Sequence, residues 1–101
     1  MGFFSAIART LFTGRRHFEP RPGIWIEPKG RDEFLYHDGE RMVVINAEMA
    51  NGELDRLIYT SSISSWLGAQ GASQVSPEER SVILDDLCRY LQRIGRTYEI
   101  R

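Results

Sequence analysis

The side chains in this sequence that could do chemistry are most concentrated in the stretch LIYTSSISSW, residues 57–66. It holds four serines: Ser61, Ser62, Ser64 and Ser65. A serine nucleophile needs a neighbouring base, usually a histidine that a third group holds in place. The two histidines, His17 and His37, stand elsewhere in the sequence, and no glycine-flanked nucleophile elbow surrounds the serines. Because short hydroxyl side chains also satisfy backbone groups in turns, we interpret the run as the end of a strand.

The histidines and the single cysteine do not predict a metal site. His17, His37 and Cys88 are far apart and lack the paired spacing of zinc ligands. No glycine-rich phosphate loop precedes a helix, so a nucleotide has no anchor. A single cysteine excludes an internal disulfide and fits a reducing cytosol. The sequence therefore predicts a protein that is not an enzyme and that binds no metal and no cofactor.

The charges are distributed unevenly along the chain. Residues 1–31 carry six basic and two acidic side chains, residues 32–86 three basic and eleven acidic, and residues 87–101 four basic and one acidic. The acidic middle disfavours nucleic acid, whose affinity comes largely from phosphate neutralisation. It favours a basic partner through electrostatic steering. No apolar stretch approaches the ~20 residues that a membrane-spanning helix needs.

The length of 101 residues, with 42% hydrophobic side chains, suits a single folded domain. Alternation and turn signals, including the Asp-Gly of HDGE, predict short strands at residues 23–29, 33–37, 41–46, 56–61 and 96–101. The unbroken apolar run at 42–45 predicts a central strand covered on both faces. The segments AEMANGELD and LGAQGASQV are interpreted as loops.

The stretch SPEE predicts the start of a long helix. Ser76 is expected to be the N-cap, Pro77 the first helical residue and Glu79 the partner in a capping box, with Gly95 ending the helix. The expected buried stripe consists of Ile83, Leu84, Leu87, Cys88, Leu91 and Ile94. We therefore expect an α+β fold: an antiparallel sheet of about five strands, the long helix of the C-terminal half on one face, and a short N-terminal helix.

Residues 1–22 are interpreted as an N-terminal amphipathic helix and linker before a domain at 23–101. Apolar side chains recur at helical spacing up to Phe12, and Pro20 and Pro22 end any helix. The segment lacks the basic start and cleavage site of a secretory signal. Docking on its own domain is favoured over binding to a membrane surface, and both alternatives stay open.

The paired acids and the tryptophans each have a structural and a functional interpretation. Glu78 and Glu79 lie in the first helical turn, where carboxylates favour the helix dipole. Asp85 and Asp86 are expected opposite the apolar stripe, on a solvated face. Trp25 and Trp66 could pack against the core or the sheet edge, or form exposed hot spots for a partner.

The motifs at residues 23–101 resemble a known family. GIWIEPKGRDEFLYHDGERMVVINAEMANGELDRLIYTSSISSW, then a loop, then SPEERSVILDDLCRYLQRIGRTYEI is similar to the immunity protein family numbered 74. These small α+β proteins neutralise polymorphic bacterial toxins, including contact-dependent growth inhibition toxins. The shared features are the strand end from Tyr59 to Trp66, the S-x-E-E-capped helix and the final G-x-x-Y-E-I-like strand. The loop LGAQGASQ departs from the family because it lacks proline and acidic residues.

The resemblance implies a cytoplasmic, non-enzymatic inhibitor that binds one cognate toxin domain as a 1:1 complex. The expected toxin is a nuclease, an RNase or tRNase, whose basic active site the inhibitor occludes without itself binding nucleic acid. The expected partner-binding residues are Glu48, Glu53, Asp55, Trp66, Asp85 and Asp86. The alternative is a small non-enzymatic nucleic-acid-binding or adaptor module, which would need the terminal arginines on one face.

Overall fold

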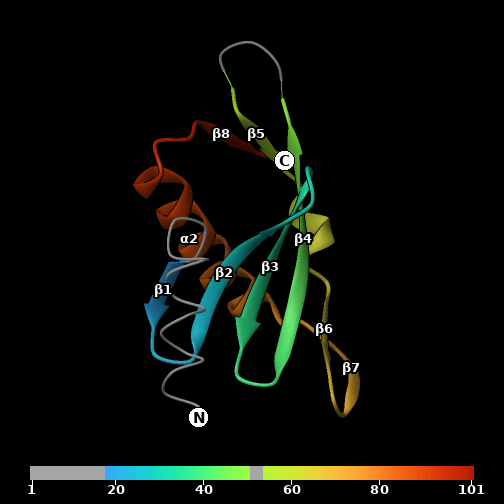
Figure 1. Cartoon of the computed structure of the whole chain (residues 1–101). Coiled ribbons are helices and arrows are strands. Elements are labelled where there is room, and N and C mark those ends of the chain that lie inside the picture. The colour runs from blue at the N-terminus through green and yellow to red at the C-terminus, as the bar shows by residue number, and fades with distance from the viewer. Residues whose placement is uncertain (1–17, 51–53) are drawn as a thin grey trace.

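The computed structural model describes residues 18–50 and 54–101. Within these ranges it has eight strands and one α-helix, which corrects the expected antiparallel sheet of about five strands. The sheet curls into a half-barrel, and helix α2 (Pro77–Arg93) packs against one face of it (Figure 1). The short N-terminal helix that the sequence predicts falls on residues outside the described ranges.

The sheet is mixed and branched. Its strands are β1 (Phe18–Arg21), β2 (Ile24–Lys29), β3 (Glu33–Asp38), β4 (Arg41–Met49), β5 (Arg56–Ile58), β6 (Ser65–Gly68), β7 (Gly71–Gln74) and β8 (Tyr98–Ile100). The order is β1-β2-β3-β4-β5-β8, while β6 pairs with the start of β4 and carries β7 beyond it. The pair β5–β8 is parallel because the long connection between the two strands, which contains the β6–β7 hairpin and α2, crosses over; this corrects the purely antiparallel expectation.

The β2–β3–β4 meander confirms the strands predicted from alternation. Gly39, at φ 61°, closes the tight hairpin between Asp38 and Arg41. The expectation that β4 is covered on both faces is wrong, because Val43 and Ile45 are buried whereas Val44 between them is partly exposed. An unbroken apolar run therefore marks a strand here, but only one of its faces reaches the core.

Three segments interpreted as linker or loop are strands instead. β1 lies in the expected linker, β4 continues to Met49, and β6 and β7 form a hairpin in LGAQGASQV. Pro20 is tolerated because β1 is an edge strand, where a missing N–H need not break the ladder. The β6–β7 hairpin turns at Ala69 and Gln70, Gly71 follows the turn with φ 97°, and the buried Trp66 anchors β6 in the core. Tertiary packing thus orders segments whose composition is typical of loops.

Helix α2 begins as the sequence predicts. The Ser76 hydroxyl accepts a hydrogen bond from the Glu79 amide at 3.1 Å, and the Glu79 carboxylate accepts one from the Ser76 amide at 2.9 Å. Gly95, at φ 75°, follows the last turn. The stripe is only partly as predicted, because Ile94 is 40% exposed.

The core fills the space between α2 and the inner sheet face. Its buried residues are Ile24, Ile26, Phe34, Tyr36, Val43, Ile45, Ala47, Ile58, Ile63, Trp66, Val75, Ile83, Leu87, Tyr90 and Leu91. In the described part of the chain, no helix is both long and apolar enough to cross a membrane.

Candidate functional site

Two of the expected partner-binding acids, Glu48 and Asp55, lie at the β4–β5 end of the molecule. Glu48 is exposed on β4 and accepts a hydrogen bond from the Tyr59 hydroxyl at 3.1 Å. The Asp55 carboxylate accepts hydrogen bonds from the Thr97 amide at 2.9 Å and its hydroxyl at 3.1 Å, and these bonds lower the pKa of Asp55. Glu53 is outside the described residues. Asp55 therefore has a structural role, because it ties β5 to the segment before β8.

The other three expected partner-binding residues are elsewhere. Trp66 is only 3% exposed, so it is not a free aromatic anchor. Asp85 is exposed on α2 and pairs with Arg89 at 2.9 Å. Asp86 is fully buried, which corrects its expected place on a solvated face. The described members of this set thus do not form one patch.

Ser62 and His37 both contact neighbouring parts of the fold. The Ser62 hydroxyl donates to the Tyr59 carbonyl at 2.6 Å and accepts from the Asn46 amide at 2.8 Å, which confirms the strand-end interpretation for this serine. The His37 ring stacks on Trp25 with centroids 3.7 Å apart, and its Nε2 atom lies 3.6 Å from Glu27. Among the described residues, no group of three or more His, Cys, Asp or Glu could hold a metal ion.

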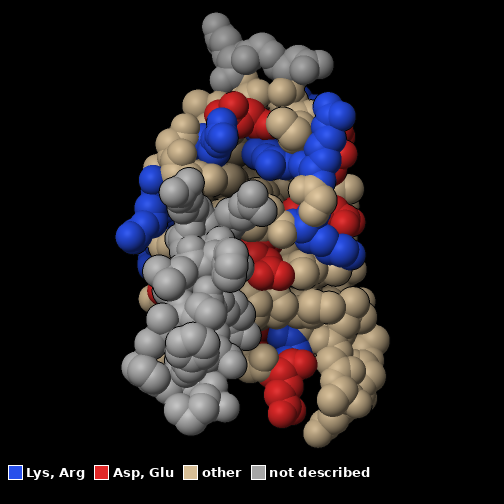
Figure 2. Space-filling model, viewed as in Figure 1, with Lys and Arg blue, Asp and Glu red and all other residues tan. Residues whose placement is uncertain are grey.

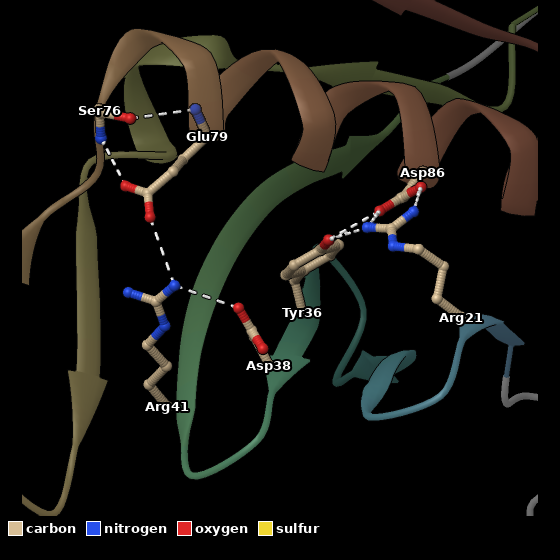
Figure 3. A network of polar contacts seen from close by, with 7 residues as sticks. All are labelled: Arg21, Tyr36, Asp38, Arg41, Ser76, Glu79 and Asp86. Carbon is tan, nitrogen blue, oxygen red and sulfur yellow. Dashed lines mark hydrogen bonds and ion pairs between the residues drawn. The ribbon is translucent and has the colours of Figure 1, made fainter.

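The buried Asp86 is held by two side chains from the sheet (Figure 3). The Arg21 guanidinium of β1 donates to both of its carboxylate oxygens, at 2.8 and 3.1 Å, and the Tyr36 hydroxyl donates at 2.7 Å. Burial, followed by the bond to Asp86, raises the pKa of Tyr36 well above its usual value. The bond to Asp86 likewise raises the pKa of Arg21. Through these hydrogen bonds, Asp86 connects helix α2 to strand β3 and to edge strand β1.

A second polar cluster centres on Arg41 at the start of β4. One nitrogen, Nη2, donates to Asp38 at 3.1 Å and to Glu79 at 3.3 Å (Figure 3). The guanidinium carbon lies 3.8 Å from the Trp66 ring centroid. The pKa of Glu79 is lowered, mainly by the hydrogen bond from the Ser76 amide and further by the charge of Arg41. The helix start, the β3–β4 turn and β6 therefore meet at Arg41.

Arg41 and Trp66 form the floor of a cleft of about 410 Å³ between the β3–β4 turn and the β6–β7 hairpin. Its walls are Asp38, Glu40, Gly68, Ala69, Gln70, Gly71, Ala72 and Ser73. A smaller hollow of about 230 Å³ shares Asp38, Arg41 and Trp66 with it and continues beneath α2 to Arg21. In Figure 2 the uncharged hairpin is the lobe at the lower right, separated from the neighbouring sheet by charged atoms.

Carboxylates surround this double cleft. Asp38 and Glu40 come from the β3–β4 turn, and Glu78 and Glu79 from the first turn of α2. Among the described lining residues, these four carboxylates face two arginines, Arg41 and Arg21, and Arg21 is already paired with Asp86. Glu40 and Glu78 are exposed, and their carboxylates form no hydrogen bond or ion pair with another described residue. The arrangement can attract and hold a cationic group.

Sequence reasoning missed this cleft because its residues already had local explanations. Asp38 and Glu40 flank the hairpin glycine, and Glu78 and Glu79 begin a helix, so each pair fitted a structural role. The sequence analysis did not predict the β6–β7 hairpin, which ends in LGAQGASQV and forms one wall of the cleft. The sequence offered only Trp66 followed by Gly68 and Gly71, which does not by itself identify a hairpin.

Comparison with protein-family models, curated proteins and solved structures found no match for this chain.

Proposed function

We propose that this chain is a non-enzymatic binding protein that recognises a basic partner protein through the cleft between the β3–β4 turn and the β6–β7 hairpin. The observation that carries the proposal is the excess of carboxylates around this cleft, lined by Asp38 and Glu40, and around the smaller hollow that adjoins it, lined by Glu78 and Glu79. Two of them, Glu40 and Glu78, are exposed and available to a partner. Exposed carboxylates around a binding site raise the rate at which a protein associates with a basic surface.

The role of Arg41 supports selection of a cation rather than an anion. Its charge is shared between Asp38 and Glu79 and lies over the face of Trp66. The positive charge of Arg41 is therefore already balanced by Asp38 and Glu79, and the further carboxylates of Glu40 and Glu78 leave the edge of the site negative. Phosphate groups would meet the exposed carboxylates of Glu40 and Glu78 before they reached this arginine.

The partner that best combines this cleft with the sequence motifs is a bacterial toxin domain. We place the chain with the immunity proteins that the motifs at 23–101 resemble, as a cytoplasmic inhibitor forming a 1:1 complex with one cognate toxin. A nuclease fits the acidic cleft because its active site is basic, and carboxylates can occupy the sites of substrate phosphates. Occlusion of that site would neutralise the toxin without chemistry.

Charge reversal at the cleft tests the proposal. The double variant Glu40→Lys/Glu78→Lys should lose at least about tenfold in affinity for the toxin domain encoded beside its gene, measured by titration calorimetry at low salt. The loss should shrink as salt screens the charges. Neither side chain holds the fold together, so circular dichroism should be unchanged.

Glu48→Lys is the matched control, because it reverses one exposed acid at the other end of β4. It should bind as the unaltered protein does. Loss of binding in Glu48→Lys but not in the double variant would move the interface to the β4–β5 end and contradict the cleft. Salt-dependent binding to RNA in place of the toxin would instead support the nucleic-acid-binding alternative.

A further inference from the structure

The described sheet has three free edges, at β1, β8 and β7. An exposed edge presents unpaired backbone groups, and natural proteins protect it with charges, proline or a bulge. Strand β1 has all three: the charges of Glu19 and Arg21, the proline Pro20, and an irregular register with β2. β8 is three residues long and carries Glu99, paired with Arg101.

β7 has none of these protections. Its sequence, Gly-Ala-Ser-Gln, has no charge and no proline, and all four residues are exposed. Its register with β6 is regular, from the pair of Ser65 with Gln74 to the pair of Gly68 with Gly71. Among the described edges, it alone is left open to another strand.

The register shows which backbone groups of β7 are free. The Val75 amide donates to the Ser64 carbonyl at 2.9 Å, which makes this a hydrogen-bonded pair. Because such pairs alternate along an antiparallel ladder, Ser73 and Gly71 also bond to β6. The N–H and C=O groups of Ala72 and Gln74 therefore point away from β6, toward the open edge.

The same register relates this edge to the cleft. Ser73 is opposite the buried Trp66 and shares its face of the hairpin. A strand added to β7 would continue that face, so every second side chain would point to the cleft side. Gly71, Ala72 and Ser73 line the cleft together with Glu40, and their small side chains leave room for an incoming chain.

We propose that β7 binds an extended basic segment of the partner by strand addition, with main-chain hydrogen bonds to Ala72 and Gln74 and alternate basic side chains above the acidic cleft. This mode rests on the proposed function and specifies its partner as a β-strand rather than a helix or a folded loop. The main-chain bonds supply affinity, and the carboxylates select for basic side chains.

Proline at an outward-facing position separates this mode from simple charge attraction. Ala72→Pro removes one free N–H and leaves the β6–β7 bonds in place, whereas Ala72→Thr keeps the N–H and adds a β-branched side chain. The probe is a short synthetic peptide of alternating arginine and threonine, titrated to millimolar concentration against ¹⁵N-labelled protein. A matching peptide with glutamate in place of arginine tests the sign of charge.

The arginine peptide should shift the amide signals of Ala72 and Gln74, and the glutamate peptide should not. Ala72→Pro should weaken binding by about tenfold, and Ala72→Thr should not, since one main-chain hydrogen bond is lost only in the first. Protection of the Val75 amide from exchange should be the same in both variants, which shows that the hairpin is intact.

Several results would overturn strand addition. These are no binding of the arginine peptide, equal binding by Ala72→Pro and the unaltered protein, or a dimer of this chain that forms through β7 and blocks the peptide. If Ala72→Pro binds normally while Glu40→Lys/Glu78→Lys does not, the acidic cleft stands as the binding site and only the strand-addition mode fails. If both variants bind normally, the proposed function fails as well.

Discussion

At the residue scale, Asp85 and Asp86 show how neighbouring carboxylates acquire different roles. Asp85 points to solvent and pairs with Arg89, whereas Asp86 is fully buried between Arg21 and Tyr36. Asp86 lies three residues after Ile83, so it shares the inward face of α2. A buried carboxylate needs partners for its oxygens, and the sheet supplies both.

Removing the buried carboxylate should destabilise the fold strongly. Asp86→Ala leaves the Tyr36 hydroxyl and the half-buried Arg21 guanidinium without their acceptor, and we expect a loss of about 2–3 kcal/mol in the free energy of unfolding. Asp85→Ala, its matched control, should change stability by no more than about 0.5 kcal/mol. Urea unfolding measures both values. Equal effects of the two substitutions would contradict the role assigned to Asp86.

Tyr36 predicts a dependence of stability on alkaline pH. Its pKa is raised in the folded protein by burial and by its bond to Asp86. The unfolded chain releases this proton near pH ~10 while the folded chain keeps it, so the contribution of Tyr36 is complete below that pH and falls as pH rises above it. The stability difference between the unaltered protein and Tyr36→Phe should therefore shrink above pH ~10. Urea unfolding across this range measures it, and a constant difference would refute the assignment.

At the element scale, the β6–β7 hairpin depends on a close approach to β4. A Cβ atom on Gly68 would lie 3.0 Å from the Glu40 carbonyl oxygen and 3.3 Å from the Arg41 Cα. Both contacts are to backbone, which cannot move aside as a flexible side chain can. Glycine at this position therefore lets the hairpin reach β4 and form the cleft wall.

Gly68→Ala should loosen this wall by forcing the hairpin away from β4. We expect a loss of about 1–3 kcal/mol in stability and faster amide exchange in β6 and β7. Ala69→Ser, at the exposed hairpin tip, is the control and should leave both unchanged. Hydrogen exchange detected by NMR gives the local effect. Unchanged exchange at Leu67 in Gly68→Ala would show that the close approach is not needed.

The elements also show how far sequence reasoning reached. The β2–β3–β4 meander, the capping box at Ser76 and the end of α2 at Gly95 were predicted because local chemistry determines them. The strands β1 and β7 and the parallel pairing of β8 were not predicted. A strand that contains Pro20, a strand of sequence Gly-Ala-Ser-Gln and a strand of three residues form only where tertiary pairing supports them. The β6–β7 hairpin forms one wall of the cleft, so the location of the cleft could not be predicted either.

At the scale of the whole molecule, the two ends of the sheet differ in the use of charge. At the β4–β5 end the acids are paired with structural partners, as Asp55 is with Thr97. At the cleft end, Glu40 and Glu78 are exposed with no described partner of their own. This difference is the reason for proposing that the partner binds at the cleft end, whereas the residues expected from the sequence included Glu48 and Asp55 at the β4–β5 end.

Hydrogen–deuterium exchange of the protein, measured alone and with the proposed partner, a basic toxin domain, tests the central claim most directly. Binding of a basic partner at the cleft predicts slower exchange at residues 38–41 and 68–75, with no change in β5 and β8 (Figure 1). Protection confined to β5, β8 and the end of β4, with the hairpin exchanging as in the free protein, would contradict it.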